Sequence, residues 1–393
     1  MLVTPRRTAL GLALLSFSTF VAVTSELLPI GVLPQVARGL DVPESTAGLS
    51  VSVYAVLVAV LAIPMTVVTE RVPRKTLLLL ALAGYALSNG IGAIAPDFLV
   101  LCIGRALGGL SHAVFYSVVT AYAAALVPPH RLGRALAFAF AGASLGSVLG
   151  VPVTSLIGVQ LGWQASFATM AVVAALLAIV VVIALPSVSS SAPEPGTAKY
   201  RPGRGLVPIV SANSLVYLGH NAAYTYIAPL LGLAGIEDAA LGGVLLLLGV
   251  LSAAGVLVAG VLADRHLGAV FIASSAIVAV TLALLTFVGG SALPAVADSA
   301  VWVLAFGALG PLITTAAVRT GAVSDSMAGA VANSASNVGI TLGSLLGSGV
   351  IALGSLSAVP IAGAVFAAAG AVVAIAYRAK FRRPDTDLPS LAP

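Results

Sequence analysis

Two charged side chains lie deep within apolar segments of this sequence, and their chemistry is the most unusual in the chain. Glu26 lies in the run VTSELLPIGVLP (residues 23–34), and Arg105 lies in the run LCIGRALGG (101–109). A buried carboxylate without a partner resists ionisation, while a nearby guanidinium favours its charged form. The distance between the two groups therefore sets whether Glu26 holds a proton. We interpret the pair as a proton-coupling site, with a static polar contact as the alternative.

Polar side chains also recur at helical spacing in three apolar segments. Residues three, four or seven positions apart share one face of a helix, so each set forms a stripe. Aromatic rings and a few amides on an apolar wall suit a neutral, amphipathic solute. Tyrosines at a membrane interface and amides that bridge helices are the alternative interpretation. The candidate solute-binding residues are His112, Tyr116, Asn213, Tyr217, His220, Asn221, Tyr224, Tyr226, Asn333 and Asn337.

Histidine provides a second candidate for the titrating group. The unperturbed pKa of its side chain is near 6.5, so its charge changes within the physiological range. His112 and His220 are therefore alternatives to Glu26 as the group that carries a proton.

These residues must be positioned by helices within a membrane. Hydrophobic residues make up 60% of the 393 positions and charged residues only 8%, which is too little polar surface to coat a soluble globule. Apolar runs of about 20 residues, the length that a helix needs to cross a bilayer, recur along the whole sequence. The prediction is an all-α polytopic membrane protein with 12 transmembrane helices, centred near residues 18, 57, 85, 112, 144, 173, 219, 251, 279, 308, 340 and 367.

Basic residues set the expected orientation. By the positive-inside rule, Lys and Arg collect in short cytoplasmic loops. If the twelve spans start from the inside, all but two of the 18 Lys and Arg residues lie on the cytoplasmic side, the two being Arg38 and Arg105. Asp298 is among the acids that fall in outer loops. Both termini are therefore predicted to be cytoplasmic, and the net charge of +5 reflects topology, with no nucleic-acid partner.

The sequence contains an internal repeat on either side of a polar linker. The linker, PSVSSSAPEPGTAKYRPGRG (186–205), is rich in Pro, Ser and Gly. The run GASLGSVLG (142–150) matches GITLGSLLG (339–347), and SELLPIG in the first span matches TYIAPLLG in the seventh, which pairs Pro29 with Pro229. Duplicated halves explain these matches. The predicted domains are a six-helix bundle over 1–185, the cytoplasmic linker over 186–205, and a six-helix bundle with a short cytoplasmic tail over 206–393.

The arrangement resembles the major facilitator superfamily. The resemblance rests on the two six-helix halves, the Arg-Gly segment of helix 4, and an acidic-basic turn in each half, TERVPR (69–74) and ADRHLG (263–268). The run GASLGSVLGVP resembles the antiporter motif of its proton-coupled drug exporters. SELLPIGVLP, YTYIAPLL and NSASNVGITLGSLLG resemble the branch of bacterial chloramphenicol and arabinose or sugar exporters. The resemblance implies two pseudo-symmetric six-helix bundles around a central cavity, with Arg105 tuning the proton affinity of Glu26.

Two further sets of residues take their expected roles from this resemblance. The acidic-basic turns would close the cytoplasmic side by ion pairs that break when the cavity opens inward, while simple anchoring of the topology is the alternative. The candidate gating residues are Glu70, Arg71, Arg74, Asp264 and Arg265. Glycines four positions apart let another helix approach closely, either for packing alone or as a face that slides between two states. The residues of this helix-packing motif are Gly142, Gly146, Gly150 and Pro152.

The sequence predicts a secondary active transporter. It lacks phosphate-loop and HExxH motifs, so neither an ATP-driven pump nor an enzyme is expected. The predicted function is proton-coupled efflux of small amphipathic compounds, such as phenicol-type drugs, by alternating access. The alternative is proton-coupled export of sugars or other polar metabolites. We expect no cofactor and no metal, only the proton as coupling ion, with a small-molecule substrate and the lipid bilayer as partners. A monomer in the bacterial inner membrane is sufficient, since one chain carries both halves.

Overall fold

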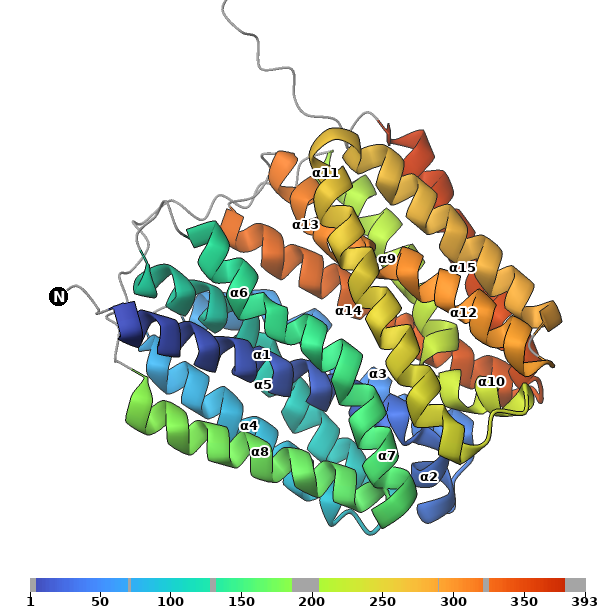
Figure 1. The fold of residues 1–393 in the computed structure, drawn as a ribbon, viewed down its shortest axis with the longest axis horizontal. Coiled ribbons are helices and arrows are strands. Elements are labelled where there is room, and N and C mark those ends of the chain that lie inside the picture. The colour runs from blue at the N-terminus through green and yellow to red at the C-terminus, as the bar shows by residue number, and fades with distance from the viewer. Residues whose placement is uncertain are drawn as a thin grey trace, which may run out of the picture.

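The computed structural model describes residues 5–69, 72–127, 132–185, 205–288, 290–320 and 325–378, and these residues form helices and no strands (Figure 1). The first half comprises α1 (Pro5–Gly31), α2 (Leu33–Gly39), α3 (Glu44–Val68), α4 (Arg74–Ala93), α5 (Phe98–Leu126), α6 (Leu132–Leu145), the π-helix η2 (Gly146–Gly150), α7 (Val151–Leu161) and α8 (Trp163–Ala184). The second half comprises α9 (Leu206–Tyr224), α10 (Ile227–Leu233), α11 (Asp238–Val288), α12 (Ala292–Gly307), α13 (Leu309–Arg319), α14 (Asp325–Ala352), the short 3-10 turn η3 (Leu356–Ala358) and α15 (Val359–Ala376).

Eleven helical segments in the described part of the chain are long and apolar enough to cross a membrane. The one predicted span that is not among these eleven is the seventh, which is centred near residue 219. It is divided into α9 and α10 at Thr225 and Tyr226, and its stripe of polar residues lowers its hydropathy. Because α9 packs against both α14 and α15, it lies among the other spans. The fold is therefore the predicted all-α polytopic membrane fold with twelve spans.

Most predicted turns coincide with helix boundaries. The long helix α11 contains two of the predicted spans, and its backbone leaves helical geometry at His266 (φ −132°, ψ 30°), within the predicted turn ADRHLG. Asp97 caps α5, since its side chain accepts a hydrogen bond of 2.9 Å from the backbone nitrogen of Val100. One acid lies elsewhere than expected: Asp298, assigned to an outer loop, lies within α12 and inside a membrane-crossing segment.

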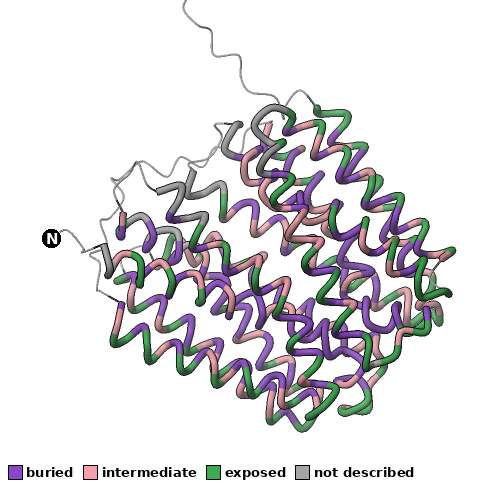
Figure 2. The backbone as a smooth tube through the Cα atoms, viewed as in Figure 1, coloured by how far each residue is buried: buried purple, intermediate pink, exposed green. Residues whose placement is uncertain are grey.

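Burial follows two apolar cores. One core consists mainly of residues from the first half, including Tyr54, Tyr85 and Phe115, and the other mainly of residues from the second half, including Phe271 and Trp302. Exposed residues, green in Figure 2, lie on the outer faces of the helices, and many of them are large and apolar. Such faces suit lipid, which needs no polar coat. The residues 186–204 of the linker lie outside the described part of the chain, so the predicted domain boundaries stay a prediction.

The internal repeat is also a repeat of contacts. Gly142 packs against the carbonyl oxygen of Ser16, Gly146 against that of Phe20, and Gly150 against the side chain of Thr24, so that α6 and η2 lie close to α1. In the second half the equivalent glycines of α14 lie against α9. Gly339 contacts the carbonyl oxygen of Ser214, Gly343 that of Leu218 and Gly347 that of Ala222. Each partner is 198 residues after its counterpart, so both halves use the same glycine ridge to join their first and fifth spans.

The glycine ridge gives a prediction for stability. Gly142→Ala is expected to destabilise the protein by about 1–3 kcal/mol, because the new Cβ would overlap the Ser16 carbonyl in a close-packed contact. Gly349→Ala is the matched control, since Gly349 also lies in a helix but has open space around its Cβ position. Thermal unfolding in detergent should show a lower midpoint for Gly142→Ala and an unchanged or raised midpoint for the control. Equal midpoints for the two variants would contradict tight packing at the ridge.

Candidate functional site

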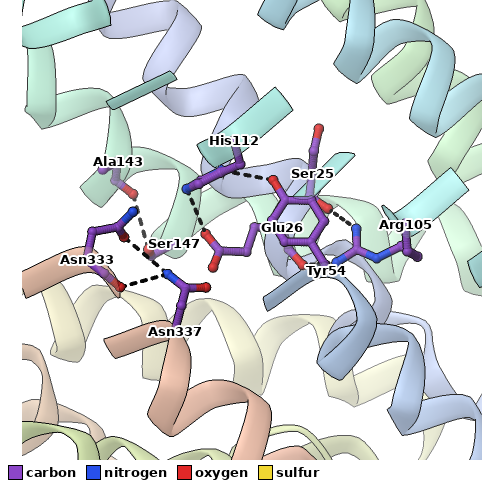
Figure 3. Close-up of polar contacts among 9 residues, drawn as sticks. All are labelled: Ser25, Glu26, Tyr54, Arg105, His112, Ala143, Ser147, Asn333 and Asn337. Carbon is purple, nitrogen blue, oxygen red and sulfur yellow. Dashed lines mark hydrogen bonds and ion pairs between the residues drawn. The ribbon is translucent and has the colours of Figure 1, made fainter. Parts of the chain in front are cut away.

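Glu26 of α1 and His112 of α5 face each other in the interior of the first half (Figure 3). The His112 Nε2 atom lies 3.7 Å from the Glu26 Oε2 atom. The His112 side chain is 1% exposed and that of Glu26 is 13% exposed, so the pair is nearly shielded from solvent. An acid and a base at this distance can share or exchange one proton with little movement. The structure thus brings together the two side chains that the sequence proposes as alternative titrating groups.

Tyr54 of α3 is the second partner of His112. Its hydroxyl lies 2.9 Å from His112 Nδ1, and the rings of Tyr85 and Tyr116 pack at the edges of the imidazole. When Tyr54 donates this hydrogen bond, the Nδ1 atom accepts it and the proton of a neutral imidazole is on Nε2, directed at the Glu26 carboxylate. In that arrangement Tyr54 holds the imidazole with an N–H facing Glu26. Sequence reasoning missed Tyr54, although it is the one aromatic residue of the second span.

Arg105 of α5 binds backbone carbonyl groups. Its Nη1 donates to the Ser25 carbonyl oxygen at 2.6 Å, its Nη2 to that of Glu26 at 2.8 Å, and its Nε to that of Ser50 at 3.2 Å. Its guanidinium carbon also lies 4.3 Å from the centre of the Tyr54 ring, a cation–π contact. Arg105 is 2% exposed. The hydrogen bonds correspond to the static interpretation of Arg105.

Pro29 explains why the Ser25 carbonyl oxygen needs a hydrogen-bond donor from outside α1. In a helix the Ser25 carbonyl would accept from the backbone nitrogen of residue 29, but proline has no N–H. Arg105 supplies the missing donor, and α1 continues unbroken to Gly31. Nearby, the Asn89 side chain donates to the Ser25 hydroxyl at 2.9 Å. The motif SELLP therefore positions Glu26 beside a helix defect that Arg105 of α5 repairs.

The second half contributes an aromatic cluster around His220 of α9. The His220 ring stacks on Phe306 with the ring centres 3.3 Å apart and on Tyr224 at 4.8 Å, and the edge of Trp302 lies at 5.1 Å. Tyr217 packs on Phe306 at 4.7 Å. We call these five residues the aromatic cluster. Sequence reasoning missed Trp302 and Phe306 of α12, although a tryptophan is rare in this chain, with two in all.

The aromatic cluster and the Glu26 pair face a shared interior. Helix α14 packs against α9, which carries His220, and against α3 and α5, which carry Tyr54 and His112. Stacking platforms from one half and an acid–base pair from the other can therefore act on one solute.

The predicted amides lie on α9 and α14, and most bond within these two helices. The Asn213 side chain donates to the Ser336 hydroxyl at 3.1 Å, and the Asn221 side chain donates to the Tyr217 carbonyl at 2.9 Å. Asn337 donates to the carbonyl and side-chain oxygens of Asn333. The side-chain oxygens of Asn213 and Asn337 and the Nδ1 atom of His220 are buried without a hydrogen-bond partner. Such atoms are costly unless something else pairs with them, and a polar group on a solute can do so.

Tyr226 lies in a seal between the halves. It is fully buried, and its hydroxyl donates to the carbonyl oxygens of Ser45 and Ser344, each at 3.3 Å. The Ser344 hydroxyl in turn pairs with that of Ser52. These residues lie near the ends of α3 and α14 where α1 ends, on the side opposite to the start of the chain. The structure thus places Tyr226 between the bundles rather than in a solute stripe. The contact between α3 and α14 continues along both helices to Ser334, whose hydroxyl donates to the Ala59 carbonyl oxygen at 2.7 Å.

The seal gives a prediction for Gly48 of α3. A side chain at Gly48 would overlap the ring of Tyr226, so Gly48→Val is expected to displace the tyrosine and open this end of the protein. In a Cys102→Ser background, a cysteine at Ser52 should react slowly with a maleimide, because Ser52 is 5% exposed, and faster once Gly48→Val is added. Gly243→Val, at a helical glycine with open space, should leave the rate unchanged. Equal labelling of all three proteins would contradict a seal at Tyr226.

The predicted gate lies largely beyond what the structure describes. Glu70 and Arg71 are outside the described residues, and only the backbone of Asp264 and Arg265 is described, within α11 before its kink. Arg74 begins α4 and is buried. Pro152 is the second residue of α7, which continues directly from η2. The gating roles stay a prediction.

Two helical bundles of related design that enclose an acid–base pair and a set of aromatic platforms define the class of a membrane transporter of small molecules. The chain belongs to the Major Facilitator Superfamily, whose family model matches residues 15–332. It is therefore a membrane transporter and not an enzyme.

Similar proteins extend over nearly the whole chain. The inner membrane transport protein YdhP of Escherichia coli K12 is 30% identical over 377 residues, 95% of this chain and 96% of that protein. A chloramphenicol efflux pump of Mycobacterium tuberculosis is 30% identical over 353 residues, 87% of this chain and 86% of the pump. A probable sugar efflux transporter of Mannheimia succiniciproducens is 30% identical over 378 residues, 94% of both chains.

Solved structures support the fold. A bacterial homolog of the human lysosomal transporter Spinster, in an inward-facing and occupied conformation, has a TM-score of 0.76 at 14% identity and covers 98% of this chain and 100% of its own. A peptide-bound transporter of the POT family has a TM-score of 0.75 at 12% identity, with 95% of this chain and 97% of its own covered. At these identities the likeness shows the fold alone.

Proposed function

We propose that this transporter exports small, aromatic, amphipathic compounds in exchange for protons. The observation that carries the proposal is the Glu26–His112 pair, which places an acid 3.7 Å from a base inside the bundle. A proton taken up by Glu26 would remove its negative charge and loosen its attraction to His112 and Arg105. Return of the charge after release would restore the attraction, so the two charge states favour different arrangements of the interior.

The aromatic cluster supports an aromatic solute. Its rings offer stacking faces, and the free polar atoms of His220, Asn213 and Asn337 offer a few orienting hydrogen bonds. Phenicol-type drugs, which combine one aromatic ring with hydroxyl and amide groups, have this character. A chloramphenicol efflux pump at 30% identity supports the same choice.

A second candidate is proton-coupled export of sugars or other polar metabolites. The buried amides on α9 and α14 favour it, and so does the similarity to a probable sugar efflux transporter. For both candidates we propose a bacterial inner membrane location with cytoplasmic termini, the proton as the coupling ion without a further cofactor, and function as a monomer.

Everted vesicles from a host that lacks its major efflux pumps would separate the candidates. With an acidic interior set by respiration, adding a phenicol should collapse part of the pH gradient in vesicles that contain the transporter and leave empty-vector vesicles unchanged. The same cells should tolerate more phenicol. If a sugar collapses the gradient and the phenicol does not, the polar-metabolite candidate replaces the aromatic one. If no solute of either class affects the gradient while radiolabelled solute still moves, proton coupling is wrong.

A further inference from the structure

Helix α4, the third span, contacts the surroundings of the Glu26–His112 pair. Asn89 of α4 is 1% exposed, and its side-chain nitrogen donates to the Ser25 hydroxyl at 2.9 Å. The same nitrogen donates to the Tyr85 carbonyl oxygen at 2.8 Å, so both hydrogens of the amide are used and its orientation is fixed. The Tyr85 ring also lies edge-on to His112, with the ring centres 6.2 Å apart. One face of α4 therefore contacts His112 and the residue before Glu26.

Ser25 lies where α1 lacks part of its own support. Because Pro29 has no N–H, the Ser25 carbonyl oxygen cannot accept from the backbone of residue 29, and it accepts from Arg105 instead (Figure 3). The Ser25 hydroxyl has a donor of its own, Asn89. Two helices thus hold one residue of α1, α5 by its carbonyl oxygen and α4 by its hydroxyl. Since Ser25 is 2% exposed, bulk water does not replace either donor.

The second half shows the same position without such a donor. Thr225 is the counterpart of Ser25 in the internal repeat. Among the described residues its buried hydroxyl has no hydrogen-bond partner, and it lies at the break between α9 and α10. In the first half, where the counterpart hydroxyl is held by Asn89, α1 is unbroken through Glu26 to Gly31. A held hydroxyl therefore accompanies an unbroken helix.

The geometry of the acid–base pair is sensitive to a small rotation of α1. With its side chains a helix has a radius of about 5–6 Å, so a rotation of about 10° moves the end of a side chain by about 1 Å. The Glu26 Oε2 atom lies 3.7 Å from His112 Nε2, already beyond ordinary hydrogen-bond length. A movement of this size therefore decides whether the two atoms form a hydrogen bond or no direct contact. The other titratable or charged side chains with contacts to the pair or to the Glu26 backbone are Tyr54, Tyr85, Tyr116 and Arg105.

We propose that Asn89 is a positioning residue for proton exchange at Glu26. By holding the Ser25 hydroxyl, it fixes the rotation of α1 and with it the distance from the Glu26 carboxylate to His112. This role rests on the proposed proton exchange at the pair and adds a residue of α4 to it. Without the Asn89 amide, the carboxylate moves away from the His112 N–H. Its charged form is then stabilised less, so Glu26 keeps its proton up to a higher pH.

Infrared titration of the purified full-length protein in lipid vesicles tests this role without a solute. The stretching band of the protonated Glu26 carboxyl is identified as the band that Glu26→Gln removes. Asn89→Ala is expected to move the midpoint of this band to higher pH by about 0.5–1 pH unit, the size that loss of one hydrogen bond allows. Ser25→Ala, which removes the other partner, should give the same shift. The double variant should shift no further than either single variant.

Ser166→Ala is the matched control. The Ser166 hydroxyl is also buried and joins two helices of the first half, since it donates to the Thr154 carbonyl oxygen at 2.6 Å, but it has no contact with the pair. This variant should lower the midpoint of thermal unfolding and leave the midpoint of the Glu26 band unchanged. A shift as large as that of Asn89→Ala would mean a general loosening of the first half and would overturn the proposal.

Three further results decide the matter. If Asn89→Ala and Ser25→Ala titrate as wild type does, Asn89 only packs α4 against α1 and the proposal is wrong. Additive shifts in the double variant would also overturn it, because the two residues would then act separately. A wild-type Glu26 band that does not respond to pH would instead contradict the proposed function, and this role with it. Should Asn89→Ala fold poorly, an unshifted midpoint in Ser25→Ala alone refutes the proposal.

Discussion

A Glu26→Gln protein is expected to bind its solute but to lose proton-driven export. Glutamine keeps the shape and hydrogen-bonding capacity of a protonated glutamate, but it can neither release a proton nor attract His112 by charge. In everted vesicles, solute-induced collapse of the pH gradient should fall to the level of empty vesicles. Solute binding to the purified variant, measured by quenching of tryptophan fluorescence, should remain close to wild type.

The pH dependence provides the decisive readout. Wild-type export should quicken as the side from which protons enter is acidified, because Glu26 then reloads faster. Glu26→Gln is fixed in the neutral form, so any remaining solute movement should not respond to pH. His112→Gln is the companion variant: if it alone abolishes the pH response while Glu26→Gln retains it, the histidine is the titrating group. An unchanged pH response in both variants would end the proposal for this pair.

The second large effect is expected at Arg105. Arg105→Ala leaves the carbonyls of Ser25, Glu26 and Ser50 without their charged donor in the interior. Each hydrogen bond to a charged group contributes about 1.5–3 kcal/mol to stability. We therefore expect a clearly lower midpoint of thermal unfolding as well as loss of transport. Arg105→Lys keeps the charge but has a single nitrogen, which cannot reach all three carbonyls in the same way. It should be intermediate in stability.

Pro29 allows the structural role of Arg105 to be separated from its electrostatic role. Pro29→Ala restores the backbone N–H that the Ser25 carbonyl lacks. The stability cost of Arg105→Ala should therefore be smaller in a Pro29→Ala background, which a double-mutant cycle of unfolding midpoints measures. Transport should stay impaired in the double variant if the charge also acts on Glu26. Strict additivity of the two stability effects would mean that Arg105 does not stabilise the defect made by Pro29.

Much of the fold could be predicted because lipid constrains sequence strongly. Spans must be apolar, helical and of fixed length, and the duplicated glycine runs at 142–150 and 339–347 marked the two halves. The seventh span was predicted as one helix, and its break at Tyr226 was not. Hydropathy averages over a window and does not sense where a backbone leaves helical geometry.

The candidate site was only partly predictable. Glu26, Arg105 and His112 were identified because they are polar residues deep within apolar spans. The direction in which each side chain points depends on how the helices are rotated against each other. Arg105 was predicted to tune the proton affinity of Glu26, with a static polar contact as the alternative, and its hydrogen bonds to carbonyls correspond to that alternative. Tyr54 and Trp302 were missed because they come from the second and tenth spans, which the stripes did not include. Asp298 was misplaced because the boundary of its span was drawn several residues too late.

The two prolines of the repeat have unequal mechanical consequences. Pro29 and Pro229 occupy equivalent positions, yet Arg105 donates to the carbonyl four residues before Pro29, whereas the tenth span, Ala292–Ala317, contains no arginine. In the first half the helix passes through its proline and ends at Gly31, while in the second it breaks at Thr225 and Tyr226, before the proline. The first half therefore has its joint after the proline, at Val32, and the second half has its joint before the proline, at Thr225 and Tyr226. When the bundles rock, bending is expected on opposite sides of the two prolines, and in the second half it falls next to the seal.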